Sequence, residues 1–217
     1  ALLFGSNAIS GVIDVEKNSI PEIEFDHLHT YITSGYDSGN KGLFNNFSLV
    51  TPINKNNFRF SLQNRKTGNQ MTPLGQLKNT SMNTTEGFFG LTRFHDGKRG
   101  TISIEHVQMD YGIPGSPEGH ISGVDMEMNK TTQKLNYHQD IDFKGFETFD
   151  LDQKFIHYAH SEFESNQKQP SVKLGQDILL LQSKMTGLKR EIGAAIQYRM
   201  FTAGGFYWTP NTSESNF

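Results

Sequence analysis

The sequence predicts an all-β protein, an antiparallel up-and-down sheet of about nine strands that forms part of a transmembrane β-barrel. Three observations support this fold class. Apolar and polar residues alternate along many segments, and no segment keeps a helical period over three turns. Tight turns also alternate with longer loops along the chain. Together these features indicate strands that each present one apolar face and one polar face.

The composition fits such strands. The chain has 217 residues, of which 17 are Phe, 7 are Tyr and 21 are Gly, while only 35% are hydrophobic. Its longest aliphatic run, Ile178 to Leu181, is far shorter than the roughly 18 residues of a membrane helix, which excludes a helical membrane protein. The net charge of -3 gives no broad basic surface for nucleic acid, and the lack of cysteine rules out disulfides and thiolate metal sites.

Alternation identifies the individual strands. In FRFSLQNRK, Phe58, Phe60 and Leu62 share one face, and Arg59 and Ser61 share the other. HLHTYITSGY, VDMEMNKTTQK and REIGAAIQYRMF show the same period of two. The run ILLL does not alternate and is consistent with a wholly buried strand. The expected strands lie near residues 27–37, 43–51, 57–66, 83–94, 100–111, 124–139, 147–163, 172–185 and 190–203.

The fifth of these ranges contains a change of phase. Ile102 and Ile104 fall on one face, whereas Val107 and Met109 fall on the other. One extra residue in a strand produces such a shift, so the sequence predicts a β-bulge near Glu105–His106.

The connections favour an outer-membrane barrel. Short turns such as PINKNN, HDGKRG, DFKGF and TGLK alternate with longer loops such as TGNQMTPLGQLKNTSM and GIPGSPEGHISG. Bacterial outer-membrane barrels show this rhythm because their periplasmic turns are tight and their outer loops are long. Several aromatic residues would then lie at the outer ends of strands and form an interfacial girdle. They are Tyr36, Tyr111, Tyr207 and Trp208.

The opening segment LFGSNAISGVIDV resembles the end of the plug domain of TonB-dependent outer-membrane receptors. The family signature is close to Leu-Tyr-Gly-Ser-x-Ala-Ile-Gly-Gly-Val-Ile-Asn-Val, from which Phe4, Ser10 and Asp14 depart conservatively. Downstream, YGIPGSPEGH, VDMEMNKTTQKLNY and FIHYAHSEFES resemble the third outer loop, sixth strand and seventh strand of the branch that includes zinc-uptake receptors. The matching residues of the opening segment are Gly5, Ser6, Ala8, Ile9, Gly11, Val12, Ile13 and Val15.

This resemblance implies a division of the chain. Residues 1–18 would be the C-terminal end of a plug domain, and residues 19–217 would be the N-terminal portion of a transmembrane β-barrel. That portion would be incomplete, because large plugged barrels of this family have about 22 strands. We therefore expect an open meander with two long edges, and a plug strand that lies apart from it.

The resemblance also implies a function. The parent protein would import a metal ion or metal chelate, with zinc favoured, by energy-coupled transport across the bacterial outer membrane. Its partners would be outer-membrane lipid, the cargo, and a TonB complex that binds segments outside this chain. The chain would not be an enzyme, would not bind nucleic acid and would need no cofactor, since zinc would be the transported ligand.

A secreted β-sandwich or jelly-roll binding module is the alternative function class. The two classes differ in what covers the apolar strand faces. In a barrel Phe58, Phe60, Leu62, Ile192 and Ile196 contact lipid, whereas in a sandwich a second sheet covers them. An enzyme is not expected, because no nucleophile elbow, P-loop or His-Glu-x-x-His motif occurs.

The best candidate for a metal site is His160, Glu162 and Glu164, which share one strand face. Imidazole and carboxylate groups suit Zn²⁺, although a hydrated polar barrel wall would show the same residues. Alternate strand residues lie about 6.5–7 Å apart, so at most two of the three can bind one ion. We expect the remaining ligands from the third outer loop or from the plug domain, and Glu118 and His120 in that loop are the nearest candidates.

A second candidate is the pair His27 and His29, which share one face near the periplasmic entry of the first strand. Histidines at this spacing can share a metal ion. Such histidines more often contact the plug domain without binding any metal, and this is the interpretation that we favour.

Overall fold

The computed structural model describes residues 23–117, 120–164, 167–206 and 212–216. The plug-like segment 1–18 lies outside these residues, as do Glu118, Tyr207 and Trp208. Within the described ranges no residue is helical, so none belongs to a helix able to cross a membrane. The strands are β1 (His29–Asp37), β2 (Gly42–Ile53), β3 (Asn56–Thr67), β4 (Met71–Thr72), β5 (Gly75–Gln76), β6 (Met82–His95), β7 (Lys98–Ile113), β8 (Val124–Phe143), β9 (Phe146–Glu164), β10 (Val172–Gly187), β11 (Arg190–Gly204) and β12 (Thr212–Asn216).

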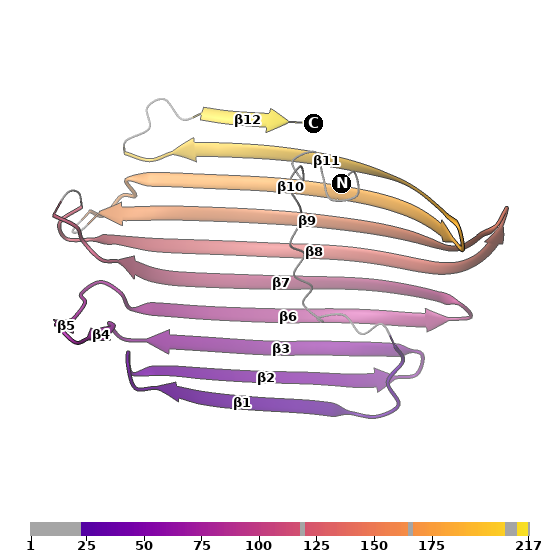
Figure 1. Cartoon of the computed structure of the whole chain (residues 1–217), viewed down its shortest axis with the longest axis horizontal. Coiled ribbons are helices and arrows are strands. Elements are labelled where there is room, and N and C mark those ends of the chain that lie inside the picture. The colour runs from indigo at the N-terminus through magenta and orange to yellow at the C-terminus, as the bar shows by residue number, and fades with distance from the viewer. Residues whose placement is uncertain (1–22, 118–119, 165–166, 207–211, 217) are drawn as a thin grey trace.

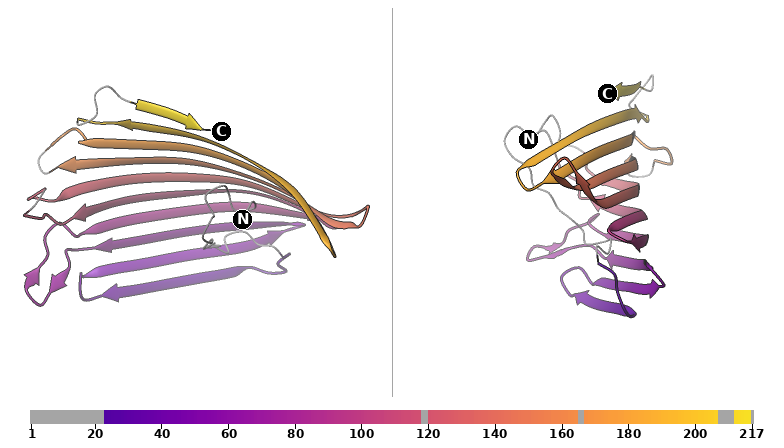
Figure 2. Two further views of the ribbon diagram at one scale, coloured as in Figure 1. Left: turned by 45° about the horizontal axis from the view of Figure 1, so that its top comes forward. Right: turned by 90° about the vertical axis from the view of Figure 1, so that its right-hand side faces the viewer.

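Ten of these strands form one antiparallel up-and-down sheet in the order β1-β2-β3-β6-β7-β8-β9-β10-β11-β12 (Figure 1). The small β4–β5 hairpin belongs to the connection between β3 and β6. The sheet is a single curved layer (Figure 2), with β1 and β12 at its two edges. All nine expected strands are present, which confirms the all-β antiparallel meander. The sheet is not closed into a barrel among the described residues.

Every connection on one side of the sheet is a two-residue turn, at Asn54–Lys55, Asp96–Gly97, Lys144–Gly145 and Leu188–Lys189. Both residues of Asp96–Gly97 and of Lys144–Gly145 have positive φ. This backbone is that of the tight hairpin turns whose twist matches the flanking strands. We call this edge the turn side and the opposite edge, which carries the longer connections, the loop side. The alternation of short and long connections is thus confirmed.

One face of the sheet carries an exposed apolar band on its turn half. Phe60, Phe89 and Ile104 are directly opposite one another on β3, β6 and β7, and each is more than a third exposed. We call this face the belt face. Its exposed apolar residues include Ile32, Phe47, Phe60, Leu62, Phe89, Ile102, Ile104, Leu135, Leu179, Leu181, Ile192 and Ile196.

The belt face becomes polar toward the loop side. Asn45, Asn64, Thr85, Gln108 and Asn129 follow one another across five neighbouring strands. They lie two rows beyond the apolar row of Phe60, a distance of about 13 Å along the strands. The apolar band ends earlier on β7 and β8, where His106 and Thr131 are polar, than on β2 and β3, where Phe47 and Leu62 continue it.

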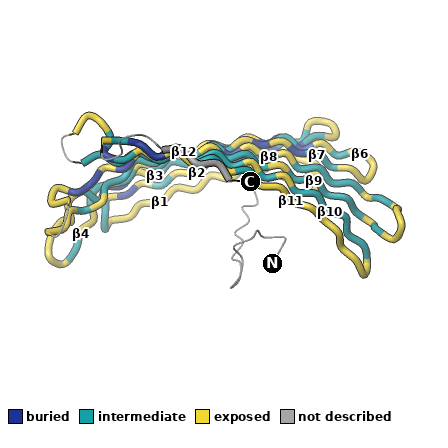
Figure 3. Tube along the Cα trace, turned by 90° about the horizontal axis from the view of Figure 1, so that it is seen from above, coloured by how far each residue is buried: buried dark blue, intermediate teal, exposed yellow. Residues whose placement is uncertain are grey.

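The opposite face, which we call the packed face, carries every buried strand side chain among the described residues. In the Cα trace coloured by burial, most of the sheet is intermediate or exposed and only short stretches are buried (Figure 3). On the turn half these side chains are mainly polar: Asn57 and Thr92 are fully buried, and the Thr101 hydroxyl donates a hydrogen bond to that of Thr92 at 3.2 Å. On the loop half they are mainly apolar and include Val124 and Met126, with Thr67 as the polar exception. The two faces thus exchange polarity at mid-height.

This exchange corrects one expectation. The predicted bulge near Glu105–His106 is wrong, because β7 pairs with both β6 and β8 in continuous register. Ile104 belongs to the belt face of the turn half, and Met109 belongs to the packed face of the loop half. The change of phase reflects two environments along one regular strand. The only register shift between β8 and β9 lies far away, between Asp140 and Phe143.

Two smaller differences also have a physical reason. Tyr111 does not join an outward girdle, because it lies on the packed face opposite Met126. Tyr36, by contrast, lies on the belt face and is exposed. The strand β12, formed by TSESN, was not expected, since this polar segment has no apolar alternation.

Candidate functional site

The predicted metal residues lie on the packed face at the loop side of the sheet. His160, Glu162 and Glu164 occupy alternate positions of β9, and their partners on β8 are Met128, Met126 and Val124. The sequence expectation that the three share one face is therefore confirmed. Nothing in the structure tests whether they bind a metal.

His160 is held in one orientation by its neighbour two residues away. Its Nδ1 shares a hydrogen bond of 3.0 Å with the Tyr158 hydroxyl, and the two rings meet edge to face. The His160 side chain is only 15% exposed, and its Nε2 lies 3.5 Å from Glu162 Oε1. This nitrogen is buried and has no hydrogen-bond partner among the described residues. A histidine whose Nδ1 is fixed and whose Nε2 is free has the arrangement of a metal ligand.

The third loop reaches the end of the same strand. His120, which has a positive φ, places its Nδ1 3.1 Å from Glu164 Oε1. The backbone N–H of Gly123 donates to the His120 carbonyl and closes the loop. His120 therefore approaches β9 as expected, but it pairs with Glu164, whereas His160 pairs with Glu162. Glu118 lies outside the described residues.

The expected residues thus form two neighbouring pairs. The described part of the chain contains one group of three His, Asp or Glu side chains whose ligand atoms all lie within 4.8 Å of one another, and this group lies elsewhere. A single ion could join His160, Glu162 and His120 only if the loop moved toward β9.

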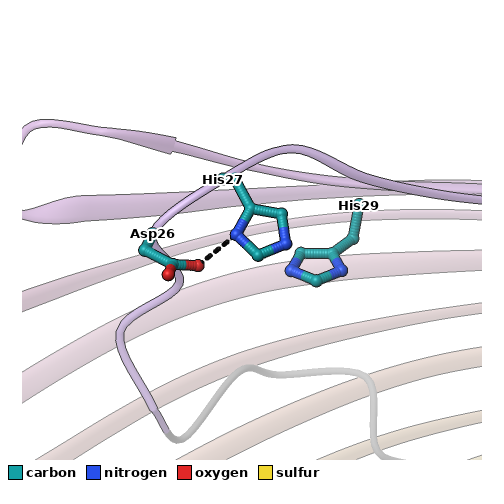
Figure 4. A group of neighbouring side chains, drawn as sticks. All are labelled: Asp26, His27 and His29. Carbon is teal, nitrogen blue, oxygen red and sulfur yellow. Dashed lines mark ion pairs between the residues drawn. The ribbon is translucent and has the colours of Figure 1, made fainter.

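That group consists of Asp26, His27 and His29 at the turn side, just before and at the start of β1 (Figure 4). The Asp26 carboxylate and the His27 imidazole form an ion pair, and the rings of His27 and His29 lie 4.2 Å apart. The sequence pattern identified the two histidines but missed Asp26. Imidazole and carboxylate ligands suit Zn²⁺, but both Asp26 and His27 are largely exposed.

The segment before this cluster is fixed to the packed face. Asn57, fully buried in β3, donates from Nδ2 to the Ile23 carbonyl at 2.9 Å and accepts from the Phe25 N–H at 3.4 Å. The Phe25 ring in turn packs edge-on against His29 at 4.9 Å. The cluster therefore has a defined place at the turn side.

Sequence reasoning missed a further property of the loop-side site, its methionine neighbours. Met128 is directly opposite His160, and Met126 is directly opposite Glu162. Their alternation with Asp125 and Glu127 was visible in the sequence, but only the pairing of β8 with β9 shows which side chains they meet. The chain matches no protein-family model, and no curated protein matches it in sequence.

Proposed function

We propose that this chain is part of the wall of a TonB-dependent outer-membrane receptor that imports a metal ion or metal chelate, with zinc favoured. The single observation that carries the membrane assignment is the apolar band of the belt face. It runs across neighbouring strands and gives way on all of β2, β3, β6, β7 and β8 to a polar row at the loop side. Outer-membrane barrels carry such a band, about 25 Å tall, where they contact lipid.

The connections support the same orientation. The two-residue turns would face the periplasm, and the longer connections would face outside. The edges β1 and β12 would pair with further strands of the complete barrel, because unpaired strand edges are very costly in lipid. The TonB-dependent class itself comes from the resemblance of residues 3–15 to the end of a receptor plug.

Zinc is favoured by the side chains of the packed face, which would line the lumen. The Nε2 of His160 has no hydrogen-bond partner among the described residues and lies close to Glu162, and the Nδ1 of His120 lies close to the Glu164 carboxylate. Nitrogen and oxygen ligands of this kind suit Zn²⁺. The proposed activity is binding and gated passage of the cargo.

The β-sandwich alternative has less support. It requires a second sheet over Phe60, Leu62 and Ile196, yet these side chains are 41%, 47% and 68% exposed. Among the described residues the only other sheet is the β4–β5 hairpin.

Cysteine labelling tests the membrane assignment, because this chain contains no cysteine of its own. Leu62→Cys and Ile104→Cys lie in the band, and Asn64→Cys and Gln108→Cys lie beyond it on the same strands and face. In the full-length protein in intact bacteria, a charged, membrane-impermeant maleimide should label Asn64→Cys and Gln108→Cys only. Denaturation of the protein should then expose the other two cysteines to the reagent. Equal labelling of all four variants in intact bacteria, or recovery of the protein in the aqueous fraction, would favour the sandwich.

A further inference from the structure

The packed face gathers methionines around His160. The chain has 7 Met, and four of them lie on this face of three adjacent strands: Met82 on β6, Met109 on β7, and Met126 and Met128 on β8. Met109 is directly opposite Met128, which is directly opposite His160. One row of the sheet thus runs Met, Met, His.

These side chains can reach one another. Residues directly opposite across antiparallel strands have Cβ atoms about 4.5–5.5 Å apart, and diagonal neighbours are about 7–8 Å apart. Met128 is the direct partner of His160, and Met126 is its diagonal neighbour. Methionine is long and flexible, so both thioethers can approach the His160 imidazole.

The side chains around His160 are partly shielded from water, and one nitrogen of its imidazole has no hydrogen-bond partner among the described residues. Met126 is 5% exposed, and the buried Nε2 of His160 has no hydrogen-bond partner among the described residues. Tyr158 holds the other ring nitrogen. A cation bound between these side chains gives up part of its hydration, and desolvation costs far less for a single charge than for a double one.

We propose that His160, Met126 and Met128 form a binding site for monovalent copper. Thioether sulfur is a soft ligand that selects Cu(I), whereas Zn²⁺ in proteins takes thiolate, imidazole and carboxylate ligands. His160 is then shared between two ligand sets. With Glu162 it offers a harder site for zinc, and with the two methionines it offers a soft site for Cu(I). Met109 packs behind Met128 on the next strand.

This inference rests on the proposed function where it makes Cu(I) a cargo, while the binding itself depends only on the packed face. The test uses the purified full-length protein with Cu(I) held reduced by ascorbate and with a chromophoric Cu(I) chelator as competitor. The double variant Met126→Leu/Met128→Leu removes both sulfurs and nearly conserves side-chain volume. Met185→Leu/Met200→Leu is the matched control, since both residues lie on the belt face.

We expect the wild type to bind Cu(I) with sulfur in its first coordination shell, as seen by X-ray absorption at the copper edge. Met126→Leu/Met128→Leu should lose that sulfur signal and weaken Cu(I) binding by about tenfold or more, with zinc affinity unchanged. His160→Ala should weaken both metals, and the belt-face control should weaken neither.

Three outcomes would overturn the site: no Cu(I) binding by the wild type, a shell of nitrogen and oxygen only, or unchanged Cu(I) affinity in Met126→Leu/Met128→Leu. The methionines would then only pack the sheet. None of these outcomes touches the receptor proposal, whose membrane assignment is tested by the cysteine labelling and whose zinc assignment is tested by zinc binding to the His160 and His120 variants.

Discussion

Ile104 and Val107 point to opposite faces of β7, because no bulge separates them. Both are apolar, and each lies where its own half of the sheet is apolar. A sheet needs this exchange if lipid surrounds its turn half and water surrounds its loop half, because the outward face must become polar at the membrane surface. Beyond that height the inward face is free to pack apolar side chains such as Met126.

A charge placed in the apolar band should oppose membrane insertion. Ile104→Arg puts a guanidinium in the row of Phe60 and Phe89, and arginine on a lipid-facing strand near the bilayer centre costs about 2–4 kcal/mol. We expect less folded protein in the outer membrane, measured by the different gel mobility of unheated and heated samples. Gln108→Arg, four residues along the same face, should insert like the wild type. Equal losses of folded protein in both variants would mean that Ile104 does not lie in a lipid-facing apolar band.

Zinc binding should depend on both loop-side histidines. In the full-length protein His160→Ala and His120→Ala should each weaken zinc affinity, and the double variant should be little weaker than either, because one ion would use both residues. His29→Ala removes the turn-side cluster and should leave this affinity unchanged. Competition with a fluorescent zinc chelator measures all four. If both single variants bind zinc as tightly as the wild type, His160 and His120 are not zinc ligands and belong only to a polar sheet face and a loop.

The Tyr158 hydroxyl should act on metal binding through His160. Tyr158→Phe removes the hydrogen bond that orients the imidazole, and loss of such a partner typically weakens metal affinity 10–100-fold. Thermal stability should change little, so the two measurements separate orientation from folding. Tyr137→Phe is a suitable control, because the Tyr137 hydroxyl donates to Gln139 on the belt face. An unchanged zinc affinity in Tyr158→Phe would mean that the Tyr158 hydroxyl does not orient His160 for metal binding.

Asn57 should fix the segment that precedes β1. Asn57→Ala removes its bonds to Ile23 and Phe25, so a nitroxide attached at Glu24→Cys should become more mobile in its electron paramagnetic resonance spectrum. Asn56→Ala, next in sequence, loses only an exposed bond to Ile53 and should leave the spectrum unchanged. A label that is equally mobile in all three backgrounds would mean that Asn57 does not anchor the segment.

Much of the fold could be predicted because alternation is a local signal. Phe58, Phe60 and Leu62 are on one face in any antiparallel arrangement, and the turn sequences fix where each strand ends. The expected strand boundaries were wrong where alternation is weak. The sixth expected strand, which is β8, ends at Phe143 instead of residue 139, in a polar stretch. The alternation of residues along a strand does not indicate whether lipid, water or other side chains cover each face. The exchange of polarity in β7 therefore resembled the effect of a bulge.

The candidate site was predictable only within one strand. His160, Glu162 and Glu164 share a face by spacing, but the position of Met128 opposite His160 depends on the register between β8 and β9. That register is set by the Lys144–Gly145 turn together with the irregularity between Asp140 and Phe143, both far along the strands from the site. Likewise, His120 meets Glu164 through a loop conformation with positive φ that the sequence does not specify.

The turn side and the loop side of the sheet differ in whether they can accept an inserted peptide. At the turn side a Cβ atom on Gly187 would come within 2.1 Å of the Gly145 carbonyl oxygen, and one on Gly97 within 2.8 Å of the Asp140 carboxylate. Neighbouring hairpins are thus fitted to one another, and an inserted peptide there would force strands apart. The loop between β7 and β8 is constrained only at its base, where Asn79 Nδ2 donates to the carbonyls of Ile113 and Val124 and a Cβ atom on Gly115 would come within 2.1 Å of the Ile121 carbonyl oxygen. An epitope tag or a displayed peptide therefore belongs beyond that base, at residues 116–117, which are exposed.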